Sequence, residues 1–314
     1  MSLQWNAESL WEQIEPMLPG LSVEVMAHCP STNTALLERA RVHIDPDSGI
    51  AQVRRSRESA AFGRRAADVQ PCLLVAEHQT QGRGRLGRLW TSSPGASLTF
   101  SLSVPITRPD WSGLSLAVGV ALAEALDPGS SRRIGLKWPN DLWVLDDAAS
   151  VDAPPPIGRK LGGILIESVT VGASRLAVIG VGINVLPLDT APLTHGYASV
   201  QELDADATPP SVLARVAAPL VQAVIDFNTS GFDGFLQRFA ARDLLNGRAI
   251  TTTQADLPLG TARGVDPDGA LRVEAPDGAV QRLVGGEVSV RLQGNEPSED
   301  EDSKAQDTGE DTPC

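Results

Sequence analysis

This sequence contains the stretch Gly82-Arg83-Gly84-Arg85-Leu86-Gly87-Arg88-Leu89-Trp90, which constrains the fold more than any other segment. It formally matches G-x-G-x-x-G, but in a dinucleotide-binding fold that motif must open a helix. Here the chain runs through Pro94-Gly95 into a predicted strand, and no Asp-Phe-Gly of a kinase follows. Three glycines let backbone amides approach an anion, and three arginines supply bidentate donors. The stretch predicts a loop that holds phosphate and carboxylate together, with an exposed basic turn as the alternative.

The segments around this loop alternate between apolar strands and amphipathic helices. Strands are predicted at 21–27, 72–76, 96–104, 134–138, 142–145, 161–169 and 177–185. Helices are predicted after a cap at Asn6 as far as Leu18, through Leu36, Leu37 and Ala40, and at 111–126, 211–228 and 232–245. These elements predict one main domain over residues 1–245.

Two segments of different character interrupt or follow that domain. Residues 44–70 lose all periodicity and carry several arginines, which predicts a mobile insertion, with a nucleic-acid contact as the less favoured interpretation. Residues 246–292 contain short strands and the turns Asp266-Pro267-Asp268-Gly269 and Pro276-Asp277-Gly278, which predicts a small β-barrel domain. Residues 293–314 form an acidic tail that we expect to be disordered.

The charge of the chain disfavours a role on duplex DNA. The formal net charge is −13, of which the tail holds −7 and the rest −6. Non-specific binding to nucleic acid depends on Lys and Arg neutralising phosphates, so an acidic body binds it poorly. The three cysteines, Cys29, Cys72 and Cys314, form neither a CxxC pair nor a zinc spacing, which favours a reducing compartment, the cytoplasm. The longest apolar stretch, 114–126, is shorter than the roughly 20 residues that cross a bilayer, so no membrane contact is expected.

Lysine is scarce, which draws attention to the few that are present. Of 26 basic residues only Lys137, Lys160 and Lys304 are lysines. A lysine kept in an arginine-rich chain indicates a site that needs a compact ammonium on a flexible stem. The alternative for Lys137 or Lys160, taken alone, is that the lysine is present by chance and has no role in a site.

Three further clusters bring polar groups to strand ends. Lys137-Trp138-Pro139-Asn140-Asp141 presents an ammonium, an amide and a carboxylate on a turn rigidified by proline, which suits a polyphosphate, or is a polar loop around a buried Trp. Arg159-Lys160-Leu161-Gly162-Gly163 leaves room for a ligand over a sheet. Asn184 ends an apolar strand, where it could also satisfy backbone groups. The sequence has no Walker loop, no G-x-S-x-G and no zinc spacing among its histidines, so hydrolase and metalloprotein functions lack support.

Taken in order, these clusters resemble those of the biotin–protein ligase family. The resemblance rests on Ser31-Thr32-Asn33, Glu77-His78-Gln79, residues 82–90, residues 137–141, Lys160-Leu161-Gly162-Gly163-Ile164 and Gly182-Ile183-Asn184, and it covers residues 20–292. It implies an α+β fold: a mixed β-sheet flanked by helices, as in class II synthetases and lipoate ligases, followed by a small C-terminal SH3-like β-barrel. It implies an enzyme that makes biotinyl-5′-AMP from biotin and Mg-ATP and transfers biotin to a lysine of a biotin carboxyl carrier protein of an acyl-CoA carboxylase.

The resemblance also assigns roles to residues. Catalytic roles fall to Lys160, which would contact the biotin carboxylate and the α-phosphate, and to Arg85. The acceptor lysine must also lose a proton from a reference pKa of about 10.4, and Asp141 is our own candidate for the group that accepts it. The biotin site would comprise Ser31, Thr32, Asn33, Gln79, Gly82, Arg83, Arg85, Lys160 and Gly163. The ATP site would comprise Arg85, Trp90, Lys137, Asn140 and Asn184. Mg²⁺ would be carried mainly by the ATP phosphates, with Asn184 as a candidate ligand.

The sequence departs from the family in three places. Thirty residues precede Ser31, too few for the winged-helix domain of bifunctional members, so a monofunctional ligase without DNA binding is expected. Residues 146–158 lengthen the gap before Lys160, and the 44–70 insertion and the tail have no derived role. Oligomeric state and the carboxylase served stay open. A lipoate–protein ligase or octanoyltransferase of the same fold is the nearest alternative, and a ligand-binding regulator is a more distant one.

Overall fold

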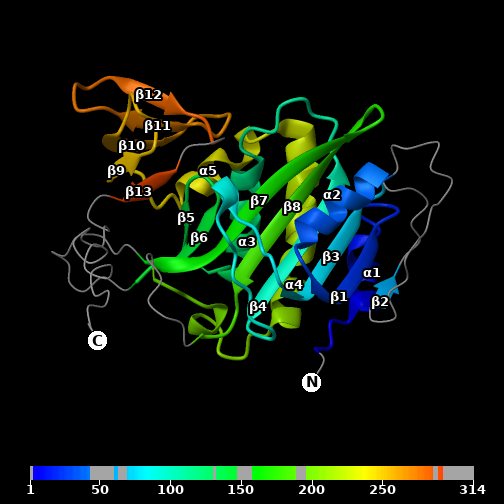
Figure 1. Cartoon of the computed structure of the whole chain (residues 1–314). Helices are drawn as coiled ribbons and strands as arrows, with labels where there is room; N and C mark the ends of the chain where they lie inside the picture. The colour runs from blue at the N-terminus through cyan, green and yellow to red at the C-terminus, as the bar shows by residue number, and fades with distance from the viewer. Residues whose placement is uncertain are drawn as a thin grey trace, which may run out of the picture.

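The computed structural model describes residues 3–42, 60–62, 69–129, 132–146, 158–188, 196–285 and 289–292. Its centre is an eight-stranded mixed sheet (Figure 1). In spatial order the strands are β2 (Ala60–Phe62), β1 (Ser22–Cys29), β3 (Cys72–Gln79), β4 (Ser97–Pro105), β8 (Ser174–Asn184), β7 (Arg159–Val171), β6 (Asp141–Val144) and β5 (Ile134–Lys137). Only β1 and β3 run parallel, and all other neighbours are antiparallel. The predicted α+β class with a mixed sheet is confirmed.

The two faces of the sheet bury different side chains because strand residues alternate between faces. On β4, Leu98, Phe100 and Leu102 face the main core, while Thr99 and Ser101 occupy the alternate, equally buried positions. The main core is covered by α1 (Ala7–Ile14), α3 (Leu114–Leu126) and α4 (Pro209–Ser230). The opposite face is covered by α2 (Thr32–Val42), whose apolar side chains pack in a smaller cluster with those of the sheet. Figure 1 shows α2 on one face of the sheet and α4 on the other.

The helix α4 is the one helix in the described part of the chain that is long and apolar enough to cross a bilayer. Half of its apolar stretch is buried inside the fold, where it packs on α3. Thr208 caps its first turn by accepting a hydrogen bond from the Ser211 amide. These are the properties of a core helix.

A second, five-stranded antiparallel sheet follows, in the order β12 (Val280–Leu283), β11 (Leu271–Glu274), β10 (Leu259–Val265), β9 (Ala249–Thr252) and β13 (Val290–Leu292). It corresponds to the small C-terminal β domain expected from the turns at 266–269 and 276–278. It is held against the first sheet by a hydrogen bond from Trp138 Nε1 to Gly269 O at 3.0 Å. Gly269 has φ +83°, and a Cβ there would lie 2.7 Å from Gly113 Cα, so glycine permits this close approach. The division at residue 245 remains a prediction.

Several predicted helices are shorter than expected. The first ends at Ile14, and Asn6, in the left-handed region with φ 46°, makes no side-chain cap. The third starts at Leu114 rather than Trp111. The helix predicted at 232–245 was wrong: only a 3₁₀ turn, η3 (Asp233–Phe235), and the short α5 (Leu236–Ala240) form there. After α5 the chain runs alongside β5, where Leu136 N donates to Arg242 O at 2.7 Å.

The predicted insertion at 44–70 is described only at β2 and at residues 69–70. Within it, β2 pairs antiparallel with β1, and the sequence pattern did not indicate this strand. The remainder of the insertion, the tail at 293–314 and most of the 146–158 segment lie outside the described residues.

Candidate active site

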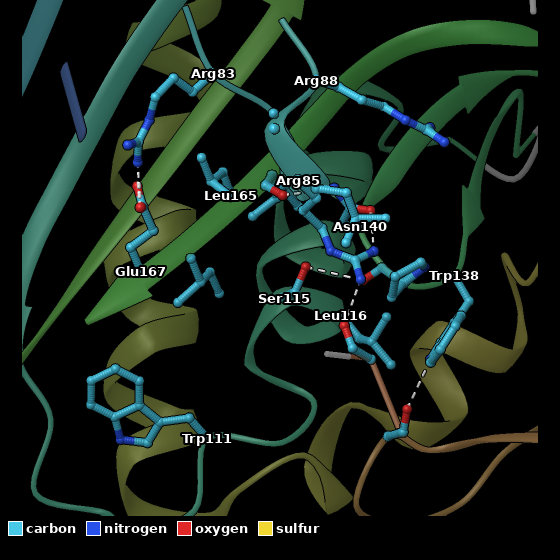
Figure 2. A pocket seen from close by; sticks show the side chains of 18 of the residues that line it. Arg83, Arg85, Arg88, Trp111, Ser115, Leu116, Trp138, Asn140, Leu165 and Glu167 are labelled. Carbon is cyan, nitrogen blue, oxygen red and sulfur yellow. Dashed lines mark hydrogen bonds and ion pairs between the residues drawn. The ribbon is translucent and has the colours of Figure 1, made fainter. Parts of the chain in front are cut away.

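Two adjoining cavities open beside the 82–90 loop, which contributes to the wall of both. The larger, about 930 Å³, lies among this loop, the start of α3, β7 and the β10–β11 turn. The smaller, about 150 Å³, lies among the loop, the start of α2, the strands β7 and β8, and β13. Figure 2 shows the larger cavity, with Arg83 of the loop reaching Glu167 of β7, Arg85 reaching Asn140, and Arg88 pointing away from both.

Backbone hydrogen bonds fold the loop back on itself. Trp90 N donates to Gly82 O at 2.9 Å, and Gly84 N donates to Arg88 O at 2.7 Å. A Cβ at Gly82 would lie 2.2 Å from Trp90 O, so only glycine fits at the base of the loop. The tip forms the 3₁₀ turn η1 (Arg85–Gly87). The loop is therefore folded on its own backbone, although residues 86–89 at its tip are exposed, and its role in binding an anion stays a prediction.

Neutral polar groups at the start of α2 form a buried network. Thr32 N donates to Gln79 Oε1 at 2.7 Å, and the Thr32 hydroxyl lies 3.1 Å from the same oxygen. The Ser101 hydroxyl lies 2.6 Å from Thr32 Oγ1 and 2.6 Å from Asn33 Oδ1. Asn33 Nδ2 donates to Leu165 O at 3.2 Å. This network fixes one end of the smaller cavity.

Two glycines of β8 make room beside that network. A Cβ at Gly180 would lie 2.3 Å from Asn33 Oδ1, and a Cβ at Gly182 would lie 2.4 Å from the Trp90 indole. Trp90 therefore lies directly over Gly182. Its Nε1 is buried with no hydrogen-bond partner among the described residues, which leaves it as a donor for a ligand.

The other end of the smaller cavity is charged. Lys160 Nζ lies 2.7 Å from Asp141 Oδ1, and Asp141 is paired in register with both Lys137 and Gly163 across neighbouring strands. A Cβ at Gly163 would be 3.4 Å from the Asp141 carboxylate and 3.6 Å from Lys160 Nζ. Asn184 Nδ2 donates to the Lys160 carbonyl at 3.3 Å. The strand register thus assembles the two clusters that the sequence places 19 residues apart.

Two further cations reach this end, and each donates a hydrogen bond to a backbone carbonyl of the C-terminal segment. Lys137 Nζ donates to Val290 O at 2.8 Å and lies 5.4 Å from the centre of the Trp143 ring. Burial lowers the pKa of Lys137 to about 8. Arg85 donates to Asn140 Oδ1 at 3.2 Å and to Gly285 O at 2.6 Å, and burial also lowers the pKa of its guanidinium (Figure 2).

Most of the residues expected to form the site line the smaller cavity together: Ser31, Thr32, Asn33, Gln79, Arg83, Arg85, Trp90, Lys137, Asn140, Asp141, Lys160 and Gly163. Gly82 supports the loop from below, and Asn184 lies behind Lys160. Ser101, Glu167 and the carbonyls of Gly285 and Val290 also take part in the site, and no sequence motif predicted them. The polar alternation on β4, with Ser or Thr at 97, 99, 101 and 103, was the signal that could have revealed Ser101.

No group of three or more His, Cys, Asp or Glu side chains that could hold a metal ion is found in the described ranges. The donors near the charged end are the Asp141 carboxylate and the Asn184 amide oxygen. Mg²⁺ takes oxygen ligands and usually binds through one or two protein groups together with substrate phosphates. The donor set therefore fits a magnesium ion that arrives with a nucleotide.

Comparisons with known proteins show which family the chain belongs to. Residues 62–184 match the Biotin/lipoate A/B protein ligase family, and residues 247–291 match the Biotin protein ligase C terminal domain. The bifunctional ligase/repressor BirA of Salmonella typhimurium is 32% identical over 265 residues, covering 82% of this chain and 79% of that protein. The biotin–[acetyl-CoA-carboxylase] ligase of Mycobacterium tuberculosis is 29% identical over 300 residues, covering 91% and 92% of the two chains.

Among solved structures, biotin protein ligase from Aquifex aeolicus in complex with biotin and ATP aligns with a TM-score of 0.63. It is 22% identical in sequence, and the alignment covers 86% of this chain and 98% of that one. At this identity the likeness shows the fold. With both family domains in order and a 32% identical relative along most of its length, this chain belongs to the biotin protein ligase family.

Proposed function

We propose that this protein activates biotin with Mg-ATP to biotinyl-5′-AMP and transfers the biotinyl group to a lysine of a biotin carboxyl carrier protein or domain of an acyl-CoA carboxylase. One observation carries the proposal: the smaller cavity joins a neutral hydrogen-bonding end to a cationic end. Biotin has the matching polarity, with a cyclic urea at one end and a carboxylate at the other. The larger cavity beside it gives space for a nucleotide and for the carrier lysine.

The neutral end would bind the urea of biotin. Thr32 and Gln79 supply a hydroxyl and an amide, and both are held in place by the network around Ser101. Ser31 and the backbone of Gly82 and Arg83 lie beside them. The indole of Trp90 covers the glycine-lined wall, where an apolar tail would lie.

The cationic end would perform the activation. A carboxylate oxygen of biotin attacks the α-phosphorus of ATP, a P–O bond forms, and the bond to the bridging oxygen breaks so that pyrophosphate leaves with the electron pair. Lys160 would neutralise the negative charge that gathers between carboxylate and phosphate. Arg85 and Lys137 would hold the phosphates, with Asn140 orienting Arg85. A magnesium ion bound with ATP supplies further neutralisation, with the Asn184 oxygen available to it.

The transfer step needs a neutral amine. The carrier lysine must lose a proton from a reference pKa of about 10.4 before its nitrogen attacks the acyl carbonyl and AMP leaves. Asp141 is our candidate acceptor for that proton. In the structure its carboxylate is paired with Lys160, a pair that a bound acyl-adenylate would compete for.

We also propose that the protein acts in the cytoplasm and does not bind duplex DNA. Cys29 and Cys72 are buried free thiols, which supports the reducing cytoplasm. The net charge of −13 supports a protein that does not bind DNA. A mobility-shift titration of duplex DNA at low salt tests this, and salt-dependent binding would contradict it.

The test of the main proposal is ATP–pyrophosphate exchange with purified protein and magnesium, comparing biotin, lipoate, octanoate and no acid. We expect exchange with biotin alone. Lys160→Ala should lower it by about 10²–10³, the typical loss when one preorganised donor is removed. Arg263→Ala, at an exposed ion pair in the C-terminal sheet, is the matched control and should exchange normally. Exchange with lipoate instead would move the chain to the other branch of the family, and no exchange with any acid would refute the activity.

A further inference from the structure

Glu167 of β7 connects the 82–90 loop to the start of α2, although no sequence motif contains it. It lies on β7, and its carboxylate has two partners from distant parts of the chain. Oε1 accepts from Arg83 Nη2 in the 82–90 loop (Figure 2). Oε2 accepts from Asn33 Nδ2 at 2.9 Å. The side chains of Glu167 and Arg83 are 27% and 41% exposed, so the pair lies at the rim of the cavity.

The carboxylate of Glu167 is oriented from inside the protein. Asn33 is only 3% exposed, and its amide is held at both ends, by the Leu165 carbonyl and by the Ser101 hydroxyl. With Oε2 fixed by this buried amide, Oε1 is left directed at the loop. A series of hydrogen bonds therefore runs from Arg83 through Glu167, Asn33 and Ser101 to Thr32 at the neutral end of the smaller cavity.

The other loop arginines are bound elsewhere. Arg85 donates to Asn140 and Gly285, and Arg88 donates to the Ser289 hydroxyl at 3.4 Å, on the side of the C-terminal sheet. The Arg83–Glu167 pair thus holds the side of the loop that faces β7 and α2. Without it, that side would keep only the backbone bonds at the base of the loop.

We propose that Glu167 is a positioning residue: it pairs with Arg83 to keep the 82–90 loop folded over the cavity and so slows the escape of the bound acid and its adenylate. The inference rests on the proposed function for its effect on biotin, but not for its effect on the loop. Glu167 touches no reacting atom. Its loss raises KM for biotin and leaves the chemical step unchanged.

The test is Glu167→Gln, which keeps the size of the side chain and an oxygen for Asn33 but removes the charge that pairs with Arg83. The matched control is Glu124→Gln, because Glu124 pairs with Arg238 at similar exposure far from the cavity. The first readout needs no ligand: trypsin cleavage after the loop arginines, followed by mass spectrometry. Because partly exposed ion pairs contribute little, we expect cleavage two- to fivefold faster in Glu167→Gln than in wild type or control.

The second readout separates positioning from a structural defect. KM for biotin should rise two- to fivefold in Glu167→Gln while kcat of adenylate formation stays within twofold. Salt screens an exposed ion pair, and in every variant it also screens the attraction between the biotin carboxylate and the cationic end of the cavity. KM of the wild type and of Glu124→Gln should therefore rise more between 0.05 and 0.5 M NaCl than KM of Glu167→Gln does. If Glu167→Gln folds poorly, trypsin cleavage of the wild type over the same salt range decides the question, because this readout involves no anionic ligand. Cleavage after the loop arginines, relative to other sites in the same protein, should become faster with salt only if the ion pair holds the loop.

Equal cleavage rates and equal salt dependence in wild type, Glu167→Gln and Glu124→Gln would overturn the proposal. Failure of the proposed function looks different: the wild type would then show no biotin-dependent exchange, while the cleavage experiment would still report whether Glu167 holds the loop.

Discussion

Ser101→Ala tests whether the buried network at the start of α2 is set by one hydroxyl. Ser101 is fully buried on β4, and its Oγ lies 2.6 Å from both Asn33 Oδ1 and Thr32 Oγ1. A hydroxyl has a single proton, and Asn33 Oδ1 can only accept, so Ser101 donates to Asn33. The single proton of the Thr32 hydroxyl faces two acceptors, Ser101 Oγ and Gln79 Oε1, and after the substitution Gln79 Oε1 at 3.1 Å is still there to accept it.

The expected loss of stability in Ser101→Ala comes from the Asn33 carbonyl oxygen, which loses its donor. Removing Ser101 Oγ leaves the Asn33 carbonyl oxygen buried against Gly180 without its donor, and an unsatisfied buried polar group costs about 1–3 kcal/mol. We expect the free energy of unfolding in urea to fall by about 2 kcal/mol with an unchanged m-value. Ser103→Ala is the control, since Ser103 lies on the same face of β4 and has no side-chain partner among the described residues. It should change stability by less than about 0.5 kcal/mol.

Repeating the titration with biotin connects this network to binding. A ligand at one hundred times its Kd stabilises the folded state by about 2.7 kcal/mol. Because Thr32 and Asn33 are expected to hold biotin, Ser101→Ala should gain less from the same biotin concentration than Ser103→Ala does. The reasoning is refuted if Ser101→Ala and Ser103→Ala are equally stable and equally stabilised by biotin.

Three further outcomes are expected. Because the pKa of Lys137 is lowered to about 8, its charge is lost well below the usual lysine range, so kcat/KM for ATP should fall as pH rises from 7 to 9; Lys137→Arg should remove that step in the pH profile. Burial raises the pKa of Asp243 to about 6, so the folded state binds more protons than the unfolded state between pH 4 and 6, and stability falls as pH rises through that window. Asp243→Asn should abolish this slope and raise the free energy of unfolding at pH 7 by roughly 1–2 kcal/mol in urea denaturation, and an unchanged slope would assign it to another group. Asp141→Asn, measured in single-turnover experiments, should slow transfer to the carrier more than adenylate formation; equal losses would remove Asp141 as the proton acceptor.

Strands were easier to predict than helix ends. Each strand of the main sheet except β2 lies within a few residues of its expected place, because short apolar runs between turn residues have few other solutions. The segment 232–245 has an apolar pattern that suits a helix, but its end is set by a remote partner. Arg242 is buried against Asp127, with Nη1 2.8 Å from the carboxylate, and this ion pair and the pairing with β5 override the local preference.

The insertion shows the limit of pattern reading. Ala60–Phe62 is three residues long, too short for any periodicity, and it becomes a strand only because the edge of β1 offers unpaired backbone groups. Asn6 is likewise a residue type that often caps helices, but its backbone is left-handed and its side chain makes no capping hydrogen bond.

The sequence by itself determined the chemical groups of the site and their order along the chain: the glycine–arginine loop, the two scarce lysines, and the amides and hydroxyls beside them. This was possible because each group stands next to glycines, prolines or strand ends whose local geometry is limited. Only the tertiary structure decided which groups meet. Arg85 donates to a carbonyl 200 residues away in the sequence, and Lys137 donates to one 153 residues away. Glu167 accepts a hydrogen bond from Asn33, 134 residues away. Such contacts depend on sheet register and on how the second sheet packs on the first, and neither is specified by the residues near any one motif.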